Sequence, residues 1–213
     1  MDVANRIETT RFLGAEFLLW LWFAGELLDG KLDAGPHGVV EISLEAQLSL
    51  TDLLSPRETI SMRGSDPFSS AEADQALKNG KLPSRALLRL KQGDSEWLVT
   101  LDAFSLALSG VKLPGYEASD DEQLFERMSL LEQLDEIVHE VYRQFLLLRL
   151  APSWQERFFP ALRAWIAGKV TLDERTARKL LAAAVGRKAA AGARGAGREG
   201  ARRHRDRSKA GAT

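Results

Sequence analysis

Apolar residues occupy nearly every side of the segment from residue 12 to residue 28, which predicts a helix without a polar face. Trp20, Trp22 and Phe23 crowd the end of this segment. A helix that is apolar all round must be buried in a core or covered by a partner. Its most apolar part, residues 12–24, is shorter than the roughly 20 residues that span a bilayer, and it contains Glu16. We therefore expect a buried or partnered helix and no membrane span.

Alternation of apolar and polar residues over residues 40–50 predicts a half-buried strand. Residues 57–63 alternate in the same way, and residues 86–91 and 96–102 flank a Gly-containing turn that is typical of a β-hairpin. Residues 104–108 are expected to continue as strand. Together these segments predict an α+β fold with an antiparallel sheet of about four to five strands.

Two Ser-x-x-Glu sequences predict helix starts, because their side chains can satisfy backbone N–H groups that the first turn leaves unpaired. Ser69 with Glu72 opens a short helix that Gly80 closes, and Ser119 with Glu122 opens a long amphipathic helix that continues to about residue 150. The apolar residues of the long helix recur at spacings of three and four, which predicts one buried face: Leu124, Met128, Leu131, Leu134, Val138, Val141, Phe145 and Leu148.

Beyond the long helix the pattern weakens. Pro152 ends that helix, and further capping sequences at Ser153 and Thr171 predict C-terminal helices up to about residue 185. The following Ala, Gly and Arg residues show no hydrophobic period, so they cannot bury enough surface to fold alone. The expected organisation is an α+β domain over residues 1–150, a helical extension over 151–186 and a basic disordered tail over 187–213.

Charge is distributed unevenly along the chain. Residues 187–213 hold nine Lys and Arg against two acidic residues, a net charge of +7. Residues 1–186 hold 20 Lys and Arg against 28 Asp and Glu, a net charge of −8. The chain has no cysteine, which excludes disulfides and thiolate metal sites and fits a reducing compartment. Without a recognisable signal peptide, the expected location is the cytoplasm.

Residues 11–23 read RFLGAEFLLWLWF and resemble a segment of the RdgC family of recombination-associated proteins. Residues 60–66, 79–82 and 96–113 also occur in that family's order, as does the Phe145-Leu146 end of the long helix. The resemblance covers about residues 6–150, which correspond to the C-terminal half of longer family members. Its segments are aromatic and aliphatic, so its specificity comes from their order along the chain.

The resemblance implies an α+β protein that assembles into a dimeric ring, encircles double-stranded DNA without sequence preference and restrains RecA-driven recombination. It implies no enzymatic activity and no cofactor. Family members carry another half before the segment that residues 11–23 resemble. We therefore expect a homo-oligomer or a partner that supplies this half, and an association with the nucleoid.

Basic residues are the candidate DNA contacts. The resemblance suggests Arg63, because the family's DNA-facing loop follows the strand that residues 59–63 match. The other cations follow from charge alone, in the body and in the densest part of the tail, so that the full set is Arg57, Arg63, Lys81, Arg85, Arg202, Arg203, Arg205, Arg207 and Lys209. Phosphate contacts release counterions, so binding of this kind should weaken as salt is added.

An alternative hypothesis is a protein-interaction module with no role at DNA. In it the apolar first helix docks on a partner or on a copy of itself through Phe17, Trp20, Trp22 and Phe23. The net negative body supports this alternative, because it repels phosphate unless its cations gather on one face. Base stacking by the same aromatic residues is disfavoured, since large aromatic side chains more often form cores and interfaces.

Candidate catalytic residues are sparse. His139-Glu140 matches the first half of a zinc-protease motif, but Arg143 stands where the second histidine ligand would be needed. The acidic residues 120–122 are explained by the preference of a helix N-terminus for negative charge. We therefore expect no catalytic residue and no metal site, and a metal-dependent nuclease is the remaining enzymatic alternative.

Overall fold

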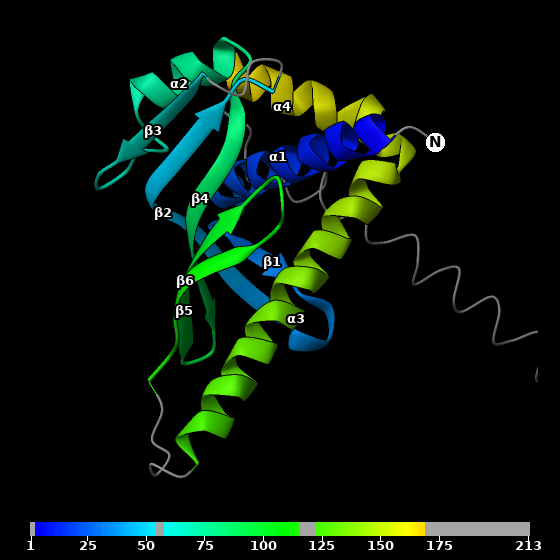
Figure 1. Cartoon of the computed structure of the whole chain (residues 1–213). Helices are drawn as coiled ribbons and strands as arrows, with labels where there is room; N and C mark the ends of the chain where they lie inside the picture. Colours follow the sequence, from blue (N-terminus) through cyan, green and yellow to red (C-terminus); the bar gives the residue numbers. More distant parts are fainter. Residues whose placement is uncertain (1–2, 54–57, 116–121, 169–213) are drawn as a thin grey trace, which may run out of the picture.

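The computed structural model describes residues 3–53, 58–115 and 122–168, whose arrangement is shown in Figure 1. The fold is α+β, as the sequence predicts. In chain order the elements are α1 (Val3–Leu28), β1 (Lys31–Asp33), the short helix η1 (Gly35–His37), β2 (Val39–Thr51), β3 (Thr59–Arg63), α2 (Ala71–Lys78), β4 (Leu82–Gln92), β5 (Ser95–Asp102), β6 (Leu108–Lys112), α3 (Gln123–Leu150), the π-helical turn η2 (Trp154–Phe158) and α4 (Phe159–Ile166).

The strands form one antiparallel sheet in the order β1-β2-β4-β5-β6. β3 also pairs with β2, with Ser61 opposite Ser49, and on the other edge of β2 the same Ser49 lies opposite Arg85 of β4. β2 is long enough, at 13 residues, to hold β1 and β3 one after the other along a single edge. The antiparallel architecture is confirmed, with six strands in the part of the chain that the structure describes, where about four to five were predicted.

β1 and β6 differ from the sequence prediction. β1 is not among the strands that the sequence predicts, because three residues are too short to show alternation; in the structure its Leu32 pairs with Val40 of β2. The sequence also predicts that residues 104–108 continue β5. Instead the Asp102 carboxylate accepts hydrogen bonds from the backbone N–H groups of Phe104 and Ser105, which closes a turn, and β6 returns antiparallel to β5.

The observed ends of α2 and α3 also differ in detail from the predicted ones. The hydroxyl of Ser70, rather than that of the predicted Ser69, accepts the capping hydrogen bond from the backbone N–H of Ala73 at 3.1 Å. Gly80 follows α2 with a φ of 84°, as predicted for a left-handed C-terminal cap. α3 begins at Gln123, and Glu122 makes no side-chain capping bond. Ser119 lies outside the described residues.

α1, α3 and α4 lie on one side of the sheet (Figure 1). α1 packs against β1, β2 and β4, and the indole N–H of Trp97 on β5 donates to the Leu130 carbonyl of α3 at 3.1 Å. Inward-facing strand residues such as Leu88, Val99 and Leu101 are fully buried beneath these helices. Burial of this apolar surface is the main stabilising term of the fold.

The aromatic residues of α1 are buried within this chain. Phe17, Trp20, Trp22 and Phe23 expose 1%, 4%, 2% and 0% of their surface. Their rings pack on aromatic residues of the following elements, including Tyr142, Phe145, Phe158 and Trp165. The prediction that these four residues form a self-association face is therefore wrong, because α3, η2 and α4 supply the cover that the sequence pattern left open.

The core continues past the end of α3. Trp154 and Phe158 of η2 and Leu162 of α4 are buried in the same hydrophobic cluster as α1. The predicted helix at residues 171–185 and the basic tail at 187–213 lie outside the described residues. Among the helices that are described, none is both long enough and apolar enough to cross a membrane.

Candidate nucleic-acid interface

The face of the sheet that points away from α1 and α3 is mainly polar, with Leu87 and Leu98 as apolar residues on it. This polarity follows from the strand alternation, because most apolar residues point to the helices and the residues between them point to the other side. β2 contributes Gln47 and Ser49 to this face, and the neighbouring strands contribute Ser61, Arg63 and Arg85. Because these residues lie on five-residue or longer strands held by neighbours, their backbone positions are fixed by the sheet.

Arg63 and Arg85 line the same shallow depression of about 130 Å³ on this face. Arg63 lies opposite Gln47 on one edge of β2, and Arg85 lies opposite Ser49 on the other edge. With strands spaced ~4.8 Å apart and ~3.4 Å between residues, this register puts the two Cα atoms about 12 Å apart. Long guanidinium side chains from both positions can therefore reach one extended ligand.

Both guanidinium groups are exposed and make no ion pair with a described residue. Asp102 lies opposite Arg85 on β5, but its carboxylate accepts hydrogen bonds from the turn at Phe104 and Ser105. Between the arginines, the hydroxyls of Ser49 and Ser61 are 3.0 Å apart. The depression thus combines two positive charges with hydroxyl groups that can donate to an anionic oxygen.

The other half of the same face is balanced in charge. Arg89 on β4 is paired with Glu45 at 3.1 Å and with Glu96 at 3.8 Å. Lys91 lies between Glu41 and Glu96 in the strand register. An anion therefore gains less at this half than beside Arg63 and Arg85, because Arg89 is held in ion pairs and Lys91 has two carboxylates opposite it, whereas Arg85 has one, that of Asp102.

A second hollow of about 420 Å³ adjoins the first and shares Ser61 and Arg63 with it. It is lined by the loop between β3 and α2, which includes Asp66, and by Glu72 of α2. Their carboxylates oppose an anionic ligand there. The charges therefore direct an anion from Arg63 across the sheet toward Arg85 and not toward α2.

The structure brings together two of the predicted DNA-binding residues, Arg63 and Arg85. Lys81 is engaged elsewhere, since its amine donates to the Glu58 carbonyl at 2.8 Å and lies 3.4 Å from the Glu58 carboxylate. Its side chain is only 14% exposed. Arg57 and the tail cations lie outside the described residues: Arg202, Arg203, Arg205, Arg207 and Lys209.

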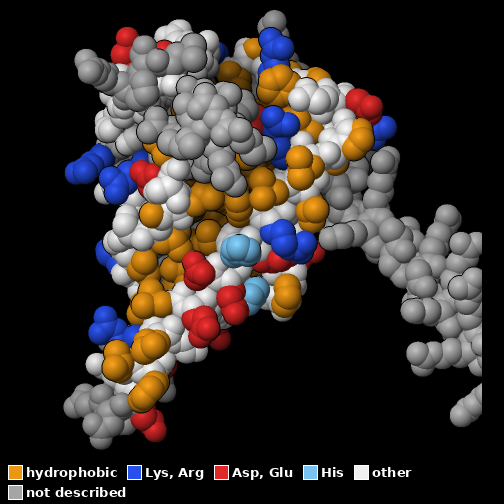
Figure 2. Space-filling model, turned by 45° about the vertical axis from the view of Figure 1, so that its right-hand side comes forward, with side chains coloured by type: hydrophobic (Ala, Val, Ile, Leu, Met, Phe, Trp, Pro, Cys, Tyr) orange, Lys and Arg blue, Asp and Glu red, His pale blue; other side chains and the backbone are white. Residues whose placement is uncertain are grey.

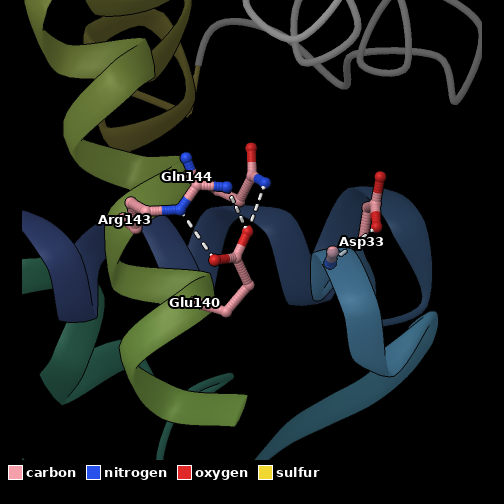
Figure 3. A network of polar contacts seen from close by, with 5 residues as sticks. Asp33, Glu140, Arg143 and Gln144 are labelled. Carbon is pink, nitrogen blue, oxygen red and sulfur yellow. Dashed lines mark hydrogen bonds and ion pairs between the residues drawn. The ribbon is translucent and has the colours of Figure 1, made fainter. Parts of the chain in front are cut away.

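The zinc-protease-like sequence on α3 forms a local ion pair. Arg143 donates to both carboxylate oxygens of Glu140, its Nε at 2.7 Å, and Gln144 donates to the same carboxylate (Figure 3). The hydrogen bond from Arg143 lowers the pKa of Glu140. Within residues 3–53, 58–115 and 122–168, no three His, Asp or Glu side chains cluster in a way that could hold a metal ion.

Sequence reasoning missed the neutral part of the candidate interface. Gln47, Ser49, Ser61 and Thr100 line the depression with the two arginines. The alternation of β2 and β3 placed the first three on the polar side of their strands, which was a usable signal. Their convergence depends on the register between β3, β2 and β4, which the sequence alone does not reveal.

Comparison of the chain with family models, with curated proteins and with solved structures finds no match.

Proposed function

We propose that the protein binds double-stranded DNA without sequence preference, as a non-enzymatic, RdgC-like factor that acts on recombination. The observation that carries this proposal is the pair of exposed arginines, Arg63 and Arg85, on the face of the sheet that none of the described helices α1, α3 and α4 covers. A modulating effect on RecA-driven recombination, which the resemblance implies, belongs to the same proposal.

The chemistry of the depression favours a phosphate backbone. Guanidinium groups present paired N–H donors that match phosphate oxygens, and serine hydroxyls add neutral donors. The depression is shallow, and contacts to phosphate and sugar position a protein on DNA without reading its sequence. The net charge of −8 over residues 1–186 makes such a local cluster of unpaired cations necessary for any approach of DNA to the body.

The experiment is a titration of fluorescent random-sequence duplex DNA with the full chain at several salt concentrations. The slope of log K against log salt reports the number of phosphate contacts, about 0.9 for each contact on B-form DNA. The double variant Arg63→Gln/Arg85→Gln should weaken binding at low salt and reduce the magnitude of this slope by about 2. Two duplexes of unrelated sequence should bind equally well.

Arg157→Gln is the matched control, because Arg157 is an exposed cation on η2, away from the polar sheet face. It should leave the slope nearly unchanged. A second arm removes residues 187–213, which carry nine Lys and Arg. If the shortened chain loses all DNA binding while the Arg63/Arg85 variant of the full chain keeps all of it, the sheet face is not the binding site.

The absence of catalysis is tested separately. The protein is incubated with duplex DNA and magnesium or manganese, and the DNA is followed over time. Time-dependent cleavage that copurifies with the protein would overturn the non-enzymatic part of the proposal.

A further inference from the structure

The first two turns of α3 expose large apolar side chains. Leu124, Phe125, Met128 and Leu131 are 63%, 72%, 57% and 44% exposed. Figure 2 shows hydrophobic side chains gathered at the lower end of this helix, beyond the part that packs on the sheet. The four residues form an apolar stripe that leaves on the order of 500 Å² of apolar surface in water, a size typical of a binding surface.

The contacts of α3 with the sheet show which way this stripe points. Gln133 of α3 donates to Gln92 at the end of β4 at 2.8 Å, and the Leu130 carbonyl accepts from Trp97 of β5 at 3.1 Å. At about 100° per residue, Leu130 lies about 60° around the helix from Gln133, and Leu131 lies about 100° further in the same sense. β4, β5 and β6 follow one another in the sheet. The stripe therefore lies on the side of α3 that is turned toward β6.

β6 and the residue after it present apolar side chains to the same side. Lys112 lies opposite Leu98, which points away from the helices, so the two neighbours of Lys112 point toward them. These neighbours, Val111 and Leu113, are only partly buried, although they pack on the hydrophobic core. The stripe and these two side chains thus give α3 a partly exposed apolar surface on its β6 side.

We propose that this surface binds an amphipathic helix of another protein, whose polar side is basic. The charges around the stripe select this partner. Residues 122–136 hold five acidic residues against one basic residue, Arg127, a net charge of −4. Glu132 and Asp135 are exposed and make no ion pair with any residue that the structure describes. Glu132 directly follows Leu131 and Asp135 lies one turn beyond it, so both carboxylates border the stripe and can pair with partner cations.

A helix matches the stripe better than an extended segment does. Leu124, Met128 and Leu131 recur at spacings of four and three, and this pattern leads on to the half-buried Val138. Side chains with this spacing form the ridges that pack against a second helix. The distance along α3 from Leu124 to Val138 is about 21 Å, which corresponds to about four turns of a partner helix.

Other occupants complement this surface less well. A second copy of α3 would set a net charge of −4 against another −4, and DNA phosphates carry the same sign. Residues 187–213 of this chain have the opposite sign, with a net charge of +7. They contain no large aliphatic or aromatic residue that could cover the stripe. A segment that combines large apolar side chains with positive charge complements both features of the surface.

The test is a fluorescence-anisotropy titration of a labelled peptide with the full chain. The probe is a synthetic helix of about 18 residues made of leucine and lysine, with the leucines at spacings of three and four. A second probe carries glutamate in place of every lysine. The lysine peptide should bind at least about tenfold more tightly than the glutamate peptide, because only its charges complement the carboxylates beside the stripe.

Variants of the full chain locate the binding surface. Met128→Gln/Leu131→Gln should weaken binding of the lysine peptide by at least about tenfold, because it removes apolar contacts at the centre of the surface. Both positions are exposed, so the variant should keep its circular dichroism spectrum. Leu150→Gln is the matched control, because Leu150 is 81% exposed at the opposite end of α3, and it should have no effect.

Charge reversal tests the chemistry of the partner. Glu132→Lys/Asp135→Lys should reduce the preference for the lysine peptide to less than about threefold or reverse it, because the carboxylates beside the stripe become cations. Glu72→Lys/Asp74→Lys changes the net charge by the same amount on α2, at the other end of the molecule (Figure 1). This control should leave the preference within about twofold of the wild type.

Several results would overturn the proposal. The first group is failure of the lysine peptide to bind, equal binding of both peptides, or binding that survives Met128→Gln/Leu131→Gln. If a peptide of residues 187–213 displaces the lysine peptide at an equal or lower concentration, the tail of this chain is the occupant. If the wild type sediments as a dimer and Met128→Gln/Leu131→Gln as a monomer, a second copy covers the stripe. None of these outcomes involves Arg63 or Arg85, so the DNA titration is decided separately.

Discussion

α1 and α3 are the two long helices among the described residues, and the sequence predicts the surroundings of α1 better than those of α3. α1 is apolar on nearly every side, which predicts a helix that is buried or covered by a partner, and its residues from Ala15 to Ala24 are buried by the same chain. α3 has the regular spacing of a helix with one covered face, yet its first two turns expose Leu124, Phe125 and Met128.

The difference shows that periodicity describes a helix and not its surroundings. An apolar stripe indicates which side of a helix must be covered. It does not identify the elements that cover this side, because they come from elsewhere in the chain. Phe145 illustrates this point, because it lies in the second half of α3 and its ring packs on Phe17 and Trp20 of α1. The first half of α3 has the same stripe and no such neighbour among the described elements.

The largest expected effect comes from truncating one phenylalanine in each half of α3. Phe145 is fully buried and touches aromatic rings of both α1 and η2, so Phe145→Ala should cost about 3–5 kcal/mol of the free energy of unfolding. Phe125 is 72% exposed, and Phe125→Ala should change it by no more than about 0.5 kcal/mol. Urea unfolding curves, recorded at a concentration where the wild type is monomeric, measure both. Equal losses would mean that the two halves are buried alike.

A smaller effect is expected for two glycines of α1. A Cβ placed on Gly14 would lie 1.7 Å from the carbonyl oxygen of Ala103, a backbone atom that cannot move aside without shifting the turn after β5. Gly14→Ala should therefore cost about 2–3 kcal/mol. A Cβ on Gly25 would lie 3.6 Å from Leu44 Cδ1, which is ordinary contact. Gly25→Ala should stabilise by up to about 1 kcal/mol, because alanine favours helix.

Thermal unfolding of the two glycine variants provides the measurement. The melting temperature should fall for Gly14→Ala and stay equal or rise for Gly25→Ala. If both variants behave alike, α1 does not lie as close to the turn after β5 as the structure shows. The close approach at Gly14 would then not explain how α1 is held on the sheet.

The fold could be predicted from the sequence wherever one local signal sufficed. The alternation over residues 40–50 and the β4–β5 hairpin were identified, because period-two patterns and a Gly-Asp turn are local. β1 was missed because three residues carry no period. The turn that separates β6 from β5 was missed because it depends on the Asp102 carboxylate, whose role appears only when the backbone around it is placed.

The candidate sites, too, could be predicted from the sequence only in their residue types and not in their spatial arrangement. Arg63 and Arg85 could be named as cations from sequence, but their convergence follows from strand register, as does the engagement of Lys81 by Glu58. The exposed stripe on α3 was assigned to the core, because its spacing is indistinguishable from that of the buried residues that follow. Tertiary contacts, and not helix propensity, decided both cases.

One contact between α1 and α3 contains a titratable group, the Glu16 carboxylate, which is buried and paired with Arg149. Glu16 Oε2 accepts a hydrogen bond from Arg149 Nε at 2.7 Å, and the Arg149 guanidinium lies 5.2 Å from the centre of the Trp154 ring. The two side chains are 7% and 25% exposed. Burial raises the pKa of Glu16 above its ordinary 4.5, and the hydrogen bond and charge of Arg149 offset this only in part. Ionised Glu16 is thus less favourable in the fold than in the unfolded chain.

The smallest expected effect is the change with pH in the free energy of unfolding that Glu16 causes. Between the ordinary pKa of 4.5 and the raised folded value, the folded protein holds more protons than the unfolded chain, so the free energy of unfolding falls as pH rises. Glu16→Gln cannot titrate. The stability of the wild type minus that of Glu16→Gln should therefore decline with pH through this window and stay flat on either side, as measured by urea unfolding from acidic to neutral pH. A difference that grows with pH would mean that pairing with Arg149 outweighs burial, and the link between α1 and α3 would then be a stabilising ion pair instead of a tolerated one.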